Sequence, residues 1–220
     1  MRSILNFLAP HKTIPHTPWR ADHRWQLSPT RVAILFFGLA IFGLGDSLLV
    51  QGNTGNAPWT VFAQGLSLKT HWALGFSTFI ISIFVLLIWI PLKEKPGFGT
   101  LSNIVLIAGF IQVGISLFPL QHSLASGVTF DLLGIALVGA GSSLYITCGL
   151  GPGPRDGAMT GIHHATGVRV GRVRLAIEVT VLIAGWLMGG TVGVGTLLFA
   201  LLIGHSVAIW LGIVARLTSQ

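Results

Sequence analysis

Long apolar stretches constrain the fold of this chain more than any other feature of its sequence. A helix needs about 20 mainly apolar residues to cross the hydrocarbon core of a bilayer, and six stretches meet or nearly meet that length. Charged residues make up only 9% of the chain, which excludes an ordinary soluble domain and a disordered chain. The predicted spans are Val32–Gln51, Trp72–Leu92, Leu101–Phe118, Leu132–Leu150, Val173–Thr191 and Gly195–Ala215.

Basic residues predict the orientation of these spans. With six crossings, 12 of the 13 Lys and Arg residues fall on one side and only Lys69 on the other. Loops rich in Lys and Arg stay in the cytoplasm, so both termini are expected there. This asymmetry explains the net charge of +7 without nucleic acid as a partner. Residues 1–30 are expected to form a cytoplasmic tail, and 31–220 a single transmembrane domain.

The chain also repeats itself. A shift of 96 residues aligns 38–124 with 134–220 without a gap, and places Gly55 and Pro58 on Gly151 and Pro154. Each copy holds three spans, so the second copy must enter the membrane from the opposite side. The sequence therefore predicts an all-α bundle of two inverted three-span repeats, a recurring plan of secondary transporters.

Each copy contains a segment too short to cross, at 58–66 and 154–165, which begins at a proline. Proline suits the first helical turn, where its missing N–H has no partner to lose. We expect a short re-entrant or loop helix at each place. The glycines of the first and fourth spans recur in register, and their simplest role is close helix packing in lipid.

The second half resembles a known family. The resemblance rests on GLGPGPRDGAMTGIHHATG and the following RLAIEVTVLIAGWLMGGTVGVGTLLFALLIG, which look like bacterial YczE-like integral membrane proteins, related to the YitT group. It covers about residues 30–216 and implies a bacterial cytoplasmic (inner) membrane location and a multi-span helical fold. It implies no substrate. Descriptions of the family sometimes count five spans, whereas the repeat and charge pattern predict six.

Three of the ionisable residues within the predicted spans are functional candidates, as such groups are by default inside a membrane. Asp46 could contact a substrate or proton, or could cap the backbone that follows its span. Glu178 could bind a cation, or could pair with Arg174 one helical turn away. His205 could relay protons, or could hydrogen-bond to a neighbouring helix.

The starts of the short helices are the remaining candidates. Free N–H groups at a helix N-terminus favour anionic ligands, and Arg155 would add a positive charge, with Asp156 beside it. The alternative is a loop helix whose charges face water. The backbone positions expected to contribute are Asn56, Pro58, Gly153 and Pro154.

No catalytic, metal-binding or cofactor-binding motif is present in the sequence, so we expect neither an enzyme nor a cofactor. The chain is expected to be a small-solute transporter or permease whose site lies between the repeats, in contact with the lipid bilayer. The alternative is a membrane partner or regulatory subunit that transports nothing itself. A homo-oligomer or a partner protein is compatible with both.

Overall fold

The computed structural model describes Pro10 and residues 13–218, and this part of the chain contains eight helices and no strand. The predicted all-helical class is therefore confirmed. The helices in chain order are α2 Pro29–Gly52, α3 Pro58–Thr70, α4 Leu74–Leu92, α5 Phe98–Leu117, α6 Leu124–Thr147, α7 Pro154–Thr166, α8 Val170–Leu187 and α9 Val194–Thr218.

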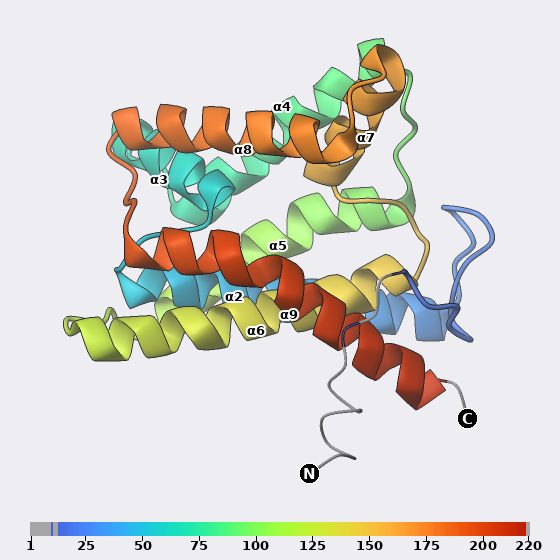
Figure 1. Ribbon diagram of the computed structural model, residues 1–220, viewed down its shortest axis with the longest axis horizontal. Coiled ribbons are helices and arrows are strands. Elements are labelled where there is room, and N and C mark those ends of the chain that lie inside the picture. Colours follow the sequence, from blue (N-terminus) through green and yellow to red (C-terminus); the bar gives the residue numbers. More distant parts are fainter. Residues whose placement is uncertain (1–9, 11–12, 219–220) are drawn as a thin grey trace.

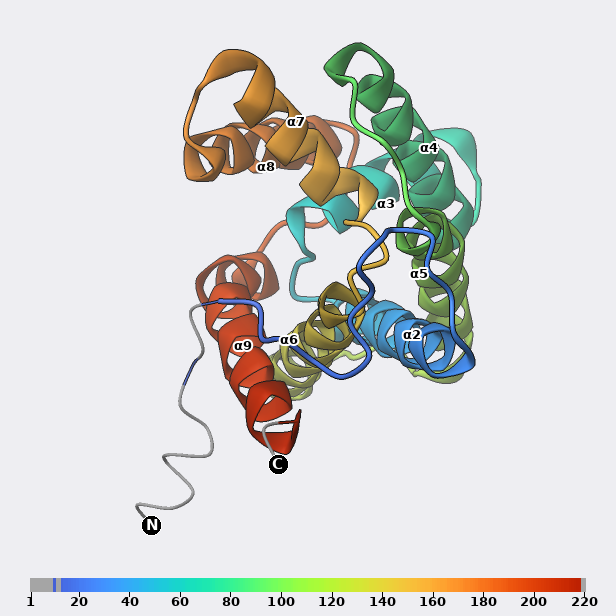
Figure 2. The same cartoon turned by 90° about the vertical axis from the view of Figure 1, so that its right-hand side faces the viewer.

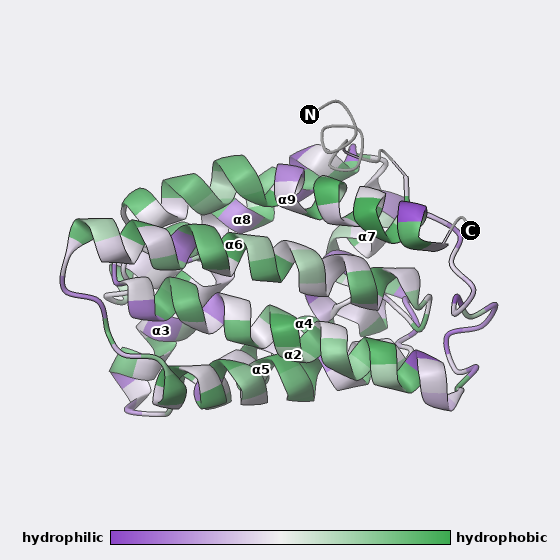
Figure 3. Ribbon diagram, turned by 90° about the horizontal axis from the view of Figure 1, so that it is seen from below, coloured by the Kyte–Doolittle hydropathy of each residue, from purple (hydrophilic) through white to green (hydrophobic). Residues whose placement is uncertain are grey.

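Five of these helices, α2, α4, α5, α6 and α9, are long and apolar enough to cross a membrane. The span predicted at Val173–Thr191 corresponds to α8, which does not join them because Arg172, Arg174 and Glu178 lie in its first half. In Figure 3 the long helices are mostly apolar along their length, and hydrophilic residues concentrate toward the two ends of the molecule.

The helices form two layers. Figures 1 and 2 place α2, α5, α6 and α9 in one layer and α3, α4, α7 and α8 in the other. The two short helices lie toward opposite ends of the second layer, α3 where α2 ends and α7 where α6 ends. Across the layer, α3 packs against α8, and α7 packs against α4.

Helix positions follow the spacing of the sequence repeat. The helices α7, α8 and α9 each begin 96 residues after α3, α4 and α5, respectively. The first helices of the two copies, α2 and α6, form the most extensive contact in the molecule. They lie side by side and run in opposite directions (Figure 1).

Glycines bring α2 and α6 together, as their packing role predicts. A Cβ built on Gly38 would lie 3.0 Å from the carbonyl oxygen of Gly141. The same relation recurs further along, where a Cβ on Gly45 would lie 2.9 Å from the carbonyl oxygen of Gly134. Larger side chains would force the two backbones apart, so the contact depends on these small residues.

The described part of the predicted N-terminal tail packs against the bundle. The Thr17 hydroxyl donates to the Thr147 carbonyl at 3.1 Å, and the Ala21 amide donates to the Cys148 carbonyl at 2.9 Å. Arg31 also holds this segment, since its guanidinium donates to backbone carbonyls of Trp19, Arg20 and Gln26. Residues 1–9 and 11–12 of the tail lie outside the described residues.

Candidate functional site

The two short helices position a central cavity. Each begins at the expected proline, Pro58 in α3 and Pro154 in α7, and each proline lines the cavity. Because proline has no N–H and fixes a helical φ, it starts a helix where the chain must turn sharply. The cavity has a volume of about 190 Å³, and all eight helices contribute residues to its wall.

The cavity wall repeats the internal spacing of the chain. Most of its residues come in pairs that stand 96 positions apart, one from each copy. The wall therefore lies where the two copies meet. These pairs are Phe42 and Val138, Ala57 and Gly153, Pro58 and Pro154, Trp59 and Arg155, Thr78 and Arg174, Ser82 and Glu178, Asn103 and Phe199, and Ile107 and Ile203.

Arg155 lies in the first turn of α7 and lines the cavity. Its guanidinium carbon lies 5.0 Å from the centroid of the Trp59 ring, a cation–π contact. Trp59 holds the corresponding position in α3, so two equivalent positions of the repeat touch each other. Within the described part of the chain, Arg155 makes no hydrogen bond or ion pair through its side chain.

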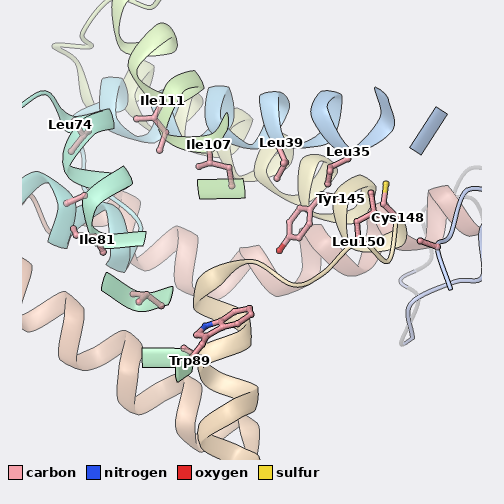
Figure 4. Close-up of a cluster of buried hydrophobic side chains, with 14 residues drawn as sticks. Leu35, Leu39, Leu74, Ile81, Trp89, Ile107, Ile111, Tyr145, Cys148 and Leu150 are labelled. Carbon is pink, nitrogen blue, oxygen red and sulfur yellow. The ribbon is translucent and has the colours of Figure 1, made fainter. Parts of the chain in front are cut away.

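Asp156 follows Arg155 and also lines the cavity. Its carboxylate accepts a hydrogen bond from the hydroxyl of Tyr145 on α6 at 2.9 Å. Figure 4 shows the Tyr145 hydroxyl pointing from α6 toward the chain that leads into α7. The backbone ahead of Asp156 is anchored too, because the Trp89 indole donates to the Pro154 carbonyl at 2.9 Å.

Asp46 is buried, with 2% of its surface exposed. Both of its carboxylate oxygens lie 2.9 Å from the Thr60 hydroxyl, which donates to them. Asp46 does not line the cavity, but it interacts electrostatically with Arg155. It therefore supports the cavity from behind α3. The alternative role of capping the backbone after α2 has no hydrogen bond to support it within the described residues.

Glu178 and Arg174 form the ion pair that their spacing predicts. The Arg174 Nε lies 2.8 Å from Glu178 Oε1, one helical turn away on α8. Both side chains also line the cavity. Glu178 therefore pairs with Arg174 along one helix, and this ion pair also forms part of the cavity wall.

The remaining two candidates, the His205 side chain and the backbone position Asn56, are not among the residues that line the cavity. His205 is exposed on α9, and its Nδ1 lies 3.2 Å from the Leu201 carbonyl on the same helix. Asn56 is buried before α3 and donates through Nδ2 to Gln64 at 2.9 Å. The structure therefore brings six of the candidates together around the cavity: Arg155, Asp156, Glu178, Pro58, Gly153 and Pro154. Asp46 lies behind this group. His205 and Asn56 are separate from it.

Sequence reasoning overlooked Tyr145, which lines the cavity, and Asp131, which does not. Tyr145 was not a candidate, although a single tyrosine in the whole chain is a visible signal. Asp131 was overlooked because the fourth span was expected to begin one residue later. It is fully buried in α6, accepts a hydrogen bond from Thr54 through Oδ2, and leaves Oδ1 with no partner among the described residues.

Metal binding finds no support in the arrangement of side chains. Among Pro10 and residues 13–218, no group of three or more His, Cys, Asp or Glu side chains is placed to hold an ion. His163 and His164 have ring centroids 5.4 Å apart, but each nitrogen contact they make is with the protein. What the cavity offers is two arginines, two carboxylates and the N-termini of two helices.

Comparisons with known proteins place this chain among membrane proteins. Residues 29–211 match a family of unknown function, DUF6198. An uncharacterized protein of Haemophilus influenzae is 44% identical, with 94% of each chain covered. The uncharacterized membrane protein YczE of Bacillus subtilis is 36% identical, covering 79% of this chain and 82% of its own length. The uncharacterized protein YyaS of Bacillus subtilis is 27% identical over 81% of this chain and 91% of its own.

No solved structure matches the chain. The extent of the family match, together with the YczE relative, confirms the resemblance predicted from the second half of the sequence. The five long apolar helices agree with the description of that relative as a membrane protein. The chain therefore belongs to the DUF6198 family and is a YczE-like membrane protein.

Proposed function

We propose that this protein is a small-solute transporter of the bacterial cytoplasmic membrane, with its binding site in the central cavity. The chain would cross the membrane six times, with α8 as the fifth crossing and both termini in the cytoplasm. Its two inverted copies would exchange roles during transport, so that the cavity opens first to one side and then to the other. Its role would be transport and not catalysis.

The geometry of the two copies supports the inverted arrangement. Corresponding helices start 96 residues apart, and α2 and α6 run in opposite directions (Figure 1). In this view α8 runs along the same axis as the long helices and, at 18 residues, is about 27 Å long. That length nearly matches a hydrocarbon core of about 30 Å, which supports a sixth crossing with Arg172 and Arg174 near its cytoplasmic end.

The cavity is the observation that carries the proposal. A ligand site on the boundary between two inverted copies contacts both of them, so movement of one copy against the other changes access to it. The paired wall positions satisfy that requirement. The contact between Trp59 and Arg155 also supports a site at this boundary, because equivalent residues can touch only near the axis that relates the copies.

The two copies differ at one helix pair, and this difference supports alternating access. In the first copy α4 packs against α5, where a Cβ on Gly75 would lie 2.5 Å from the Ala108 carbonyl oxygen. In the second copy α8 barely touches α9. The corresponding glycines, Gly171 and Gly204, have no described atom within 4 Å of an added Cβ. Closing α8 onto α9 while α4 leaves α5 would produce the opposite state.

Reconstitution tests this proposal. Proteoliposomes with the purified protein would be incubated with a defined mixture of amino acids, organic acids, amines and sugars, and their contents measured by mass spectrometry. We expect at least one solute to enter faster than into protein-free liposomes. Ser142→Leu should reduce this uptake at least fivefold, because Ser142 is a small residue of the cavity wall.

A matched variant outside the cavity controls for folding. Leu201 is an exposed residue of α9 that does not line the cavity, so Leu201→Ala should leave uptake unchanged. Protein that folds but moves none of the solutes, and that co-purifies with another membrane protein, would instead support the role of a partner or regulatory subunit. The exposed His205 favours such a contact, since a polar side chain facing lipid is costly unless it is covered.

A further inference from the structure

We propose that the central cavity binds a small organic anion with an apolar body, and that Arg155 holds its acidic group. This inference names the class of substrate for the proposed transporter and in that sense rests on the proposed function. Binding of the anion can nevertheless be measured without transport. It follows from the contacts of each charged group around the cavity, and from the chemistry of the remaining wall.

Arg155 is the charged residue of the wall whose side chain lacks a hydrogen-bond partner. An arginine has five N–H donors in a planar fork, and a buried or half-buried guanidinium normally satisfies them. Here the Trp59 ring lies against the guanidinium and provides no acceptor in its plane. The donors at the edge of the fork are therefore available to a ligand, and a carboxylate or phosphate matches them with two parallel hydrogen bonds.

The carboxylates around Arg155 are each held by another group. Glu178 accepts from Arg174, Asp156 accepts from Tyr145, and Asp46 accepts from Thr60. All three interact with Arg155 electrostatically, yet none forms an ion pair with it among the described residues. Arg155 thus lies near three carboxylates, but none of them accepts a hydrogen bond from its guanidinium.

The helix N-termini increase the positive potential at this place. The start of each short helix lines the cavity, through Ala57 and Pro58 on α3 and through Gly153 and Pro154 on α7. A helix N-terminus carries about half a positive charge. On the wall itself, Arg155 and Arg174 balance Asp156 and Glu178. The partial charges of the two helices then leave a positive surplus at the wall, while the remaining carboxylate, Asp46, lies behind the wall and accepts a hydrogen bond from Thr60.

The rest of the wall suits an apolar body. Beyond the charged residues most of the lining side chains are apolar, among them Phe42 and Val138 and, on α9, Phe199, Ile203 and Val207. Its volume of about 190 Å³ is somewhat larger than the ~150 Å³ apolar cavity that accommodates benzene in another protein. An aromatic or branched acid of about that size fits both parts of the wall.

Binding of three molecules of similar shape tests the proposal. Benzoate, benzamide and benzylamine share a ring of the same size but carry a negative, neutral and positive group. Their affinities for the full chain in detergent would be measured by calorimetry, with thermal stabilisation as a second readout. We expect benzoate to bind at least tenfold more tightly than the other two, and inorganic phosphate to bind more weakly than benzoate.

Arg155→Gln should weaken benzoate binding about ten- to hundredfold, the range of a charge-assisted hydrogen bond. Arg172→Gln is the matched control, because Arg172 is exposed on α8 and lies outside the cavity; it should leave the affinity unchanged. If Arg155→Gln does not fold, Arg155→Lys keeps the charge but loses the fork, and should still weaken binding severalfold.

Three results would overturn the anion site. They are no binding of benzoate by the wild-type protein, equal binding of the three ring compounds, and an undiminished affinity after Arg155→Gln or Arg155→Lys. These outcomes are distinct from a failure of the transport proposal. Uptake of a neutral or cationic solute without benzoate binding would reject only the anion site, whereas benzoate binding without uptake of any solute would reject only transport.

Discussion

At the scale of single residues, one hydrogen bond ties each short helix to the long helix before it. Thr60 and Asp156 are equivalent positions in the third place of α3 and α7. Thr60 donates to Asp46 on α2, and Asp156 accepts from Tyr145 on α6. The short helix supplies the hydroxyl in the first copy and the carboxylate in the second, and the partners, Asp46 and Tyr145, do not hold equivalent positions of the repeat. Both links hold the helix starts that form the cavity.

Loss of the Thr60 hydroxyl should destabilise the fold. Thr60→Val keeps the shape of the side chain but leaves the buried Asp46 carboxylate without its donor, which should lower the free energy of unfolding by about 1–3 kcal/mol. Thr60→Ser retains the hydroxyl and should stay closer to wild type. Unfolding in mixed detergent micelles, followed by tryptophan fluorescence, measures both. Equal stability of the two variants would show that this hydrogen bond contributes little.

At the scale of helices, small residues decide which pairs can touch. A Cβ on Gly157 of α7 would lie 1.9 Å from the ring of Trp89 on α4, whereas a Cβ on Gly171 of α8 meets no described atom within 4 Å. Trp89 is itself almost fully buried. The α4–α7 contact therefore has no spare room, while the start of α8 is free to approach another helix.

These two glycines predict opposite responses to alanine. Gly157→Ala should cost about 1–3 kcal/mol of stability, the usual penalty for overpacking. Gly171→Ala should be neutral or slightly stabilising, since alanine favours helix over glycine by up to ~1 kcal/mol. The same unfolding measurement compares them. A neutral Gly157→Ala would mean that Trp89 moves aside easily.

The gap between α8 and α9 makes a further prediction at this scale. If the helices close during transport, cysteines at Gly171 and Gly204 should form a disulfide under mild oxidation in membranes, in a Cys148→Ser background. Leu175 and Leu201 are exposed residues of the same two helices, and cysteines there should cross-link much less. Mass spectrometry of the digested protein detects the bond. Equal cross-linking of the two pairs would argue against a specific closure.

At the scale of the whole molecule, charge and helix direction agree on one orientation. The beginning of α2 and the end of α9 lie at the same end of the molecule (Figure 1). Most of the basic residues flank helix ends on that side, while Lys69 ends α3 at the other. Positive loops remain in the cytoplasm, so Lys69 is expected outside.

Cysteine labelling in intact cells measures this orientation. Lys69, in the last turn of α3, and Lys93, directly after α4, are exposed, and Cys148, the natural cysteine, is fully buried. Lys69→Cys should react with a membrane-impermeant maleimide in intact cells, whereas Lys93→Cys should react only after permeabilisation. The reverse pattern would invert the proposed topology, and labelling of both in intact cells would reject an odd number of crossings between them.

Much of the architecture was predictable because it depends on local sequence. Apolar length predicted the membrane helices, and Pro58 and Pro154 predicted where the short helices begin, since proline limits its own backbone. The helix at the predicted span Val173–Thr191 is not among the five long apolar helices, because charges near the start of α8 lower its apolar character. The pair Arg174 and Glu178 was also predictable, because four residues make one turn of a single helix.

The sequence by itself determined the membrane class and the starts of the two short helices, since each depends on residues close together in the chain, and comparison of the sequence with itself gave the spacing of the two copies. Only the tertiary structure decided that Arg155 meets Trp59, that Tyr145 reaches Asp156, that Asp46 lies behind the cavity and that His205 lies outside it. The reason is physical. A helix that is apolar on all sides gives no sign of which face turns inward, and glycine contacts between neighbouring helices set that rotation.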